Sequence, residues 1–123
     1  MYINGEWIQS TDKFPVSNPA NGEHIGEVAD GRRDDAIAAI DAAAAALPAW
    51  SGVTAYDRSA ALYRAYQLMM ERRPALAELM TREQGKPLKA ALNEVKYAAD
   101  FLLWFAEEAK RVYGETIPSA RSD

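Results

Sequence analysis

The chain has 123 residues, of which 49% are hydrophobic and 26% are charged, the proportions of a globular protein. This length allows one domain and hardly two. The net charge of −4 argues against nucleic-acid binding, which normally requires a basic surplus. The sequence has no cysteine and one histidine, His24, which excludes a disulfide, a thiolate nucleophile and a zinc site made of Cys or several His side chains.

The N-terminus and the apolar stretches give no sign of a membrane or secretory segment. The first five residues lack the basic and apolar regions of a signal peptide. The longest apolar stretch, residues 36–50, is interrupted by Asp41 and Pro48 and is too short to cross a bilayer. We therefore expect a soluble, cytoplasmic protein with no nucleic-acid or membrane partner.

The first thirty residues predict two β-hairpins. Asn4-Gly5 lies between two β-prone pieces in residues 2–9, and both residues accept the positive φ that a two-residue hairpin turn requires. A second hairpin is expected from Phe14 and Val16 on one strand and residues 24–28 on the other, with the turn at 18–22.

From Arg33 onward the apolar residues follow helical spacing. Pro48 is expected to end the first helix, Thr54 and Asp57 form a capping box for the second, and Gly85 is suited to end the third. The predicted fold class is α+β, with two hairpins followed by about four helices, at residues 33–47, 55–73, 74–84 and 87–114.

The last predicted helix is apolar over more than one face. One stripe, expected to pack along the helix, consists of Leu88, Leu92, Val95, Ala99, Leu102, Ala106, Ala109 and Tyr113. A second stripe consists of Tyr97, Phe101, Trp104 and Phe105. Because the short upstream helices are expected to cover one stripe and not both, the aromatic stripe predicts a partner surface. The alternative is that these aromatic side chains fill the local core.

Residues able to perform chemistry are scarce. No Gly-x-Gly-x-x-Gly, P-loop or Gly-x-Ser-x-Gly motif occurs. His24 lies beside a turn, where a structural or solvated histidine is expected. The charged segment 83–87 has the composition of a helix end with solvated charges. Composition and spacing therefore indicate an α+β unit with an unpaired aromatic surface, and they do not indicate a specific function.

Several segments, in this order, resemble the N-terminal quarter of the NAD(P)-dependent aldehyde dehydrogenase superfamily. They are Tyr2-Ile-Asn-Gly-Glu-Trp7, Asn18-Pro-Ala-Asn-Gly-Glu23, Ala49-Trp50, Glu83-Gln-Gly-Lys-Pro87, Trp104-Phe-Ala-Glu-Glu108 and Tyr113-Gly-Glu-Thr-Ile-Pro118. Within the superfamily, residues 80–88 and 104–108 are most similar to succinate-semialdehyde dehydrogenases and related semialdehyde enzymes.

The resemblance implies oxidation of an aldehyde to a carboxylate with NAD or NADP by a homodimer or homotetramer. In that family a cysteine thiolate attacks the aldehyde, an asparagine side chain stabilises the oxyanion, and a glutamate activates water. None of these parts matches this sequence, so no catalytic or cofactor-binding residue is assigned and the chain alone is expected to be inactive. We expect an N-terminal fragment without a complete domain. It would contain hairpins at 1–30, helices at 31–114 and the first residues of an oligomerisation segment at 115–123.

The resemblance also implies two sites that this sequence retains. Glu83 and the main-chain carbonyls of Val16 and Ser17 match positions that hold a structural monovalent cation, although Glu83 could instead be a solvated capping acid. Asn93, Tyr97 and Phe101 match positions that line the substrate tunnel, and Asn93 replaces a glycine of many semialdehyde relatives. Two other functions remain open, both using the Tyr97, Phe101 and Trp104 face: a non-catalytic helical interaction module, and an inactive subunit of a longer dehydrogenase.

Overall fold

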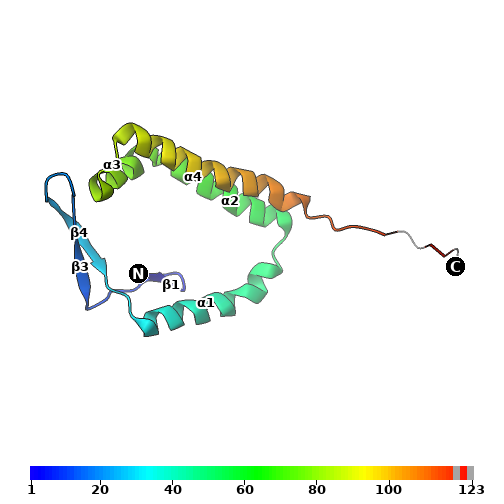
Figure 1. Cartoon of the computed structure of the whole chain (residues 1–123). Helices are drawn as coiled ribbons and strands as arrows, with labels where there is room; N and C mark the ends of the chain where they lie inside the picture. The colour runs from blue at the N-terminus through cyan, green and yellow to red at the C-terminus, as the bar shows by residue number, and fades with distance from the viewer. Residues whose placement is uncertain (118–119, 122–123) are drawn as a thin grey trace.

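The structure is a computed structural model that describes residues 1–117 and 120–121. The strands are β1 (Tyr2–Ile3), β2 (Glu6–Trp7), β3 (Lys13–Ser17) and β4 (His24–Ala29). The helices are α1 (Arg33–Ser51), α2 (Ala55–Glu71), α3 (Arg73–Gln84), α4 (Leu88–Glu108) and the short 3₁₀ helix η1 (Ala109–Arg111). The α+β order, hairpins before helices, is as predicted, and Figure 1 shows α1 standing apart from a bundle of α2, α3 and α4.

Both predicted hairpins form, each as a separate antiparallel pair. The first turns at Asn4 and Gly5, whose φ angles of 51° and 82° are both left-handed, as a two-residue turn requires. In the second, the amide of Gly22 donates to the carbonyl of Asn18 at 2.8 Å and closes the predicted turn. The register of this hairpin skips Ile25 on β4, which makes a one-residue bulge beside Ser17.

The first helix runs further than predicted, because Pro48 lies inside it and does not end it. A proline removes one backbone donor, but the chain can continue helically beyond it when later amides still find acceptors. Here the amide of Gly52 donates to the carbonyl of Pro48 at 3.3 Å, and the Ser51 hydroxyl donates to the same carbonyl at 2.9 Å. The helix therefore ends at Ser51.

The start of α2 and the end of α3 follow the predicted signals, but α2 ends at Glu71 and not at Arg73. The Asp57 carboxylate accepts from the Thr54 hydroxyl and not from the Thr54 amide that a capping box requires. The Thr54 hydroxyl oxygen accepts a hydrogen bond from the amide of Asp57 at 3.2 Å and donates to its carboxylate at 2.7 Å. Gly85 ends α3 with a left-handed φ of 72°, and its amide donates to the carbonyl of Thr81. A side-chain cap and a left-handed glycine each satisfy backbone groups that a helix end leaves open.

The last helix is shorter than predicted. It ends at Glu108, is followed by η1 up to Arg111, and does not reach Gly114. Val112 and Tyr113 are each 84% exposed, whereas η1 still contacts α2. A helix draws most of its stability from packing, so the helical path stops where α2 no longer supports it.

The fully buried part of the bundle core is made almost entirely of small side chains, and the partly buried Met69, Leu76, Met80 and Leu92 pack against it. Its fully buried apolar residues, among those that the structure describes, are Ala77, Ala91, Val95, Ala99 and Ala106. Alanines allow the helix backbones to approach closely, and α4 packs along both α2 and α3. The predicted packing stripe of α4 is wrong at its two ends, because Leu88 is half exposed and Tyr113 lies beyond the helix, while Ala91 takes the buried position of the first turn.

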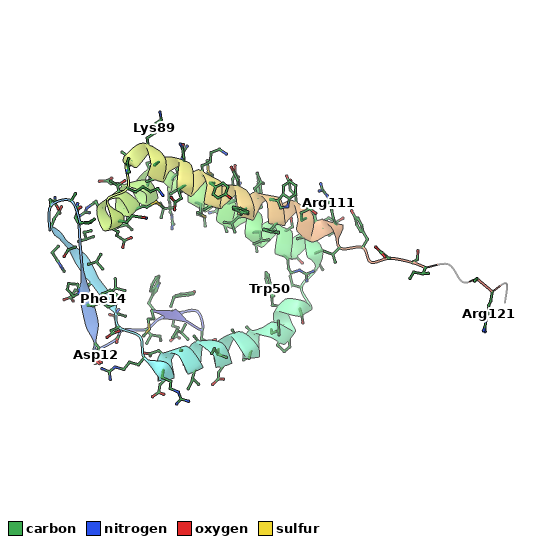
Figure 2. The ribbon with its side chains drawn as sticks, in the orientation of Figure 1. Asp12, Phe14, Trp50, Lys89, Arg111 and Arg121 are labelled. Carbon is green, nitrogen blue, oxygen red and sulfur yellow. The ribbon has the colours of Figure 1, made fainter. Side chains whose placement is uncertain are left out.

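The aromatic stripe of α4 is not part of this core. Tyr97, Phe101, Trp104 and Phe105 are between 48% and 65% exposed. The alternative that these side chains fill the local core is therefore wrong for this chain. Helix α1 is similarly uncovered, since it has no buried residue and its apolar Ile40 is 66% exposed. Figure 2 shows Trp50, at the end of α1, on the side that faces the α2–α4 bundle.

Candidate functional site

The aromatic face of α4 gathers the predicted tunnel residues on one helical row. Asn93, Tyr97 and Phe101 are four residues apart, a spacing that places them one above the other on the same face. The rings of Tyr97 and Phe101 meet edge to face, with centroids 4.9 Å apart and planes at 79°. Together with Trp104 and Phe105 they line a shallow hollow.

The hollow has an apolar floor and one acidic neighbour. Asp100 is its only charged lining residue among those described, and the Nζ of Lys96 donates to the Asp100 carboxylate at 2.6 Å. This pair spans one turn of the helix and both partners are partly exposed, so its contribution is modest. The hollow is therefore suited to an apolar group that lies across the rings, because the carboxylate of its charged lining residue, Asp100, is already paired with Lys96.

A second cluster forms where the tip of the β3–β4 hairpin meets the end of α3. The Arg82 guanidinium pairs with the Glu23 carboxylate at 3.1 Å, and a Cβ added to Gly85 would lie 3.3 Å from the Cγ of Pro19. Residues 59 positions apart in the sequence are thus brought together. This contact holds the hairpin against the loop that leads into α4.

The three residues predicted to hold a cation lie on the two elements joined by this contact. Val16 and Ser17 end β3, which contacts α3, and Glu83 lies in the last turn of α3. Glu83 is exposed and lines a surface hollow with Met80 and Gln84. Nothing within the described part of the chain groups three acids or histidines around one point.

Sequence reasoning missed the two ion pairs that shape these surfaces. Lys96 and Asp100 are four residues apart on a helix, a spacing that could have revealed their pair. The Arg82–Glu23 pair had no such signal, because it depends on how a hairpin and a helix pack.

His24 is exposed on β4 opposite Ser17, which agrees with a solvated histidine. None of the helices within the described residues is long and apolar enough to cross a membrane.

Comparison with known proteins decides the family. The sequence profile described as "Aldehyde dehydrogenase family" matches residues 7–123. The chain belongs to the aldehyde dehydrogenase family. It is 51% identical to the succinate-semialdehyde dehydrogenase [NADP(+)] GabD of Escherichia coli K12 over 123 residues, which are 98% of this chain and 26% of that protein.

A second relative and a solved structure agree with this assignment. The glutarate-semialdehyde dehydrogenase of Pseudomonas putida KT2440 is 52% identical over 124 residues, covering 99% of this chain and 26% of that protein. The crystal structure of an E. coli NADP-dependent enzyme matches with a TM-score of 0.93 at 51% identity, over 98% of this chain and 26% of that one. The predicted family and fold are thus confirmed, and the chain spans about a quarter of the length of these relatives.

Proposed function

We propose that this chain serves as the N-terminal part of an NAD(P)-dependent dehydrogenase that oxidises a semialdehyde to a carboxylate. The observation that carries the proposal is the identity of 51–52% to two semialdehyde dehydrogenases along nearly the whole of this chain. The nucleophile, the oxyanion donor and the nicotinamide site would come from the other three quarters of such a protein. The sequence has no cysteine, so the 123 residues by themselves are expected not to oxidise aldehydes.

The exposed faces of α1 and α4 support this role. Side chains such as Ile40 and Trp104, 66% and 59% exposed, would be covered when the rest of a dehydrogenase packs against them. In that assembly the row of Asn93, Tyr97 and Phe101 would line one wall of the substrate tunnel. Edge-to-face rings offer a rigid apolar wall for the methylene chain of a short semialdehyde, and Asn93 would place an amide at the end of that row.

A graft tests the proposal directly. The matching quarter of the E. coli enzyme is replaced by this chain, and formation of NADPH from succinate semialdehyde is followed by absorbance. We expect activity within about tenfold of the parent enzyme, which corresponds to a loss of at most about 1.4 kcal/mol in transition-state stabilisation. The isolated chain is the negative control. A well-folded graft without activity would refute the proposal.

Substitutions in the graft test the tunnel wall separately. Tyr97→Ala and Asn93→Gly should change the ratio of kcat/KM for succinate and glutarate semialdehydes, since these substrates differ by one methylene, a difference worth about 1–3 kcal/mol in a fitted pocket. Lys89→Ala is the matched control, because Lys89 is exposed near the start of the same helix (Figure 2). Equal ratios in all three variants would exclude Asn93 and Tyr97 from the tunnel.

The cation site is proposed on Glu83 and the carbonyls of Val16 and Ser17. A carboxylate and main-chain carbonyls are hard oxygen donors, which suit a small hard cation. The contact of β3 with α3 supports this grouping, and the Glu83 carboxylate forms no hydrogen bond or ion pair within the described residues. In the graft, K⁺ should raise the melting temperature relative to a bulky organic cation, and Glu83→Gln should remove that difference.

The aromatic face favours one second candidate, a non-catalytic module or inactive subunit that binds a partner through Tyr97, Phe101 and Trp104. The module predicts a cooperatively folded monomer with a specific, saturable partner. The inactive subunit predicts co-purification with a longer, cysteine-containing dehydrogenase. The intact mass of the native protein distinguishes this second candidate from the proposed dehydrogenase. A mass of 13.6 kDa favours the subunit, and a mass several times larger favours a dehydrogenase, for which we propose a cytoplasmic homodimer or homotetramer.

A further inference from the structure

The sequence contains the tripeptide Asn-Gly-Glu twice, at residues 4–6 and 21–23, and each copy lies in a hairpin turn. In an Asn-Gly pair the backbone nitrogen of the glycine can reach the side-chain carbonyl carbon of the asparagine, because glycine has no Cβ to hinder the approach. Both copies are exposed, and neither glycine has a heavy atom within 4 Å of the position that a Cβ would occupy. The two sites therefore share the same chemistry and the same steric freedom.

The hydrogen bonds of the two turns differ. In the second turn the amide of Gly22 donates to the carbonyl of Asn18 at 2.8 Å, and the Oδ1 of Asn21 accepts from the amide of Glu23 at 3.0 Å. The Glu23 carboxylate also pairs with Arg82 of α3. Both reacting groups, the glycine nitrogen and the asparagine amide, are thus held in place.

The first turn holds neither group. Among the described residues, no hydrogen bond uses the amide of Gly5 or the side chain of Asn4. The strands on either side have two residues each, extended only by the reciprocal bonds of Met1 and Ile8. Apart from these bonds the ribbon is held by the ring contact of Tyr2 with Trp7 and by the contact of β1 with α1, so it opens more easily than the longer second hairpin. The turn also borders a surface hollow against α1, so water reaches it.

We propose that Asn4 is a site of spontaneous deamidation, and that the structure protects Asn21. When the turn opens, the Gly5 nitrogen loses its proton to hydroxide and bonds to Cγ of Asn4. The bond from Cγ to the side-chain nitrogen breaks and ammonia leaves. Water then opens the cyclic imide at either carbonyl, giving aspartate or isoaspartate. One water enters for each ammonia released, and nothing is oxidised or reduced.

The products alter the first hairpin. Either one adds a negative charge two residues before Glu6. Isoaspartate also lengthens the main chain by one methylene, which is incompatible with the register that pairs Tyr2 with Trp7 and Ile3 with Glu6. The N-terminal hairpin therefore carries a slow, irreversible change that the second hairpin resists.

The two copies act as internal controls for each other in one experiment. The full chain is incubated at mildly alkaline pH in ¹⁸O-labelled water, with and without urea, and digested with trypsin. Cleavage after Lys13 and Arg32 places the two sites in separate peptides, 1–13 and 14–32. Asn18 does not interfere, because the nitrogen of Pro19 carries no proton and cannot form the imide.

We expect Asn4 to deamidate about tenfold faster than Asn21 in buffer, and both to react within about twofold of each other in urea. Asn4→Gln should abolish the labelled product in peptide 1–13 without changing Asn21. Arg82→Ala, which removes the partner of Glu23, should accelerate Asn21 alone. Equal rates in buffer, a faster Asn21, or an Asn4 rate in buffer far below its rate in urea would each overturn the proposal.

Discussion

Substitution of Gly85 by alanine adds only one methyl group, but it should destabilise the chain strongly. Gly85 has a φ of 72°, and a left-handed backbone costs a residue with a Cβ about 1–2 kcal/mol. The new Cβ would also lie 3.3 Å from the Cγ of Pro19, so the hairpin tip must shift slightly. With a urea m-value of about 1–3 kcal/mol/M for a small protein, we expect the midpoint of Gly85→Ala to fall by about 1 M.

Two further variants test whether the left-handed backbone of Gly85 causes the loss of stability. Gly26→Ala is the matched control, because Gly26 lies in β4 without a positive φ and no atom lies within 4 Å of its would-be Cβ, so its midpoint should stay the same or rise. Gly85→Asn carries a larger side chain but tolerates the left-handed backbone better. It should be more stable than Gly85→Ala. Equal midpoints for Gly85→Ala and Gly26→Ala would refute the reasoning.

Three other predictions concern the helix caps, the ion pair and the core. Thr54→Ala should lower the free energy of unfolding by about 1 kcal/mol in urea titrations, because the amide of Asp57 loses its acceptor, whereas Ser at this position should retain stability. A double-mutant cycle on Arg82 and Glu23 should give a coupling of about 0.2–1 kcal/mol that falls in high salt, and a salt-independent coupling would contradict it. The isolated chain should bind the dye ANS and unfold at a low urea midpoint, and a high midpoint without dye binding would show that its exposed faces do not weaken it.

The local signals in the sequence predicted most of the fold. Asn4-Gly5, Thr54 and Gly85 each determine a turn or a helix end through the backbone of a few adjacent residues, and each acts as predicted. The errors occur where packing decides. Pro48 would end an isolated helix but is accommodated within α1, and the residues before Gly114 lose the support of α2.

The candidate site was predictable only in part, for a physical reason. Periodicity identified the aromatic row on α4, since residues four apart share a face wherever the helix lies. It could not show whether that face is covered, because coverage depends on the rest of the fold. The structure shows which face of α4 is covered within this chain. The buried face of α4 carries Ala91, Val95, Ala99 and Ala106, whereas Tyr97 and Trp104 lie outside this face and are 65% and 59% exposed. A helix whose inner face is alanine and whose outer face is aromatic has its larger apolar area available for a second contact. In the proposed function this second contact is made by parts of a dehydrogenase outside these 123 residues, and for that reason the residues by themselves indicate less about function than the family resemblance does.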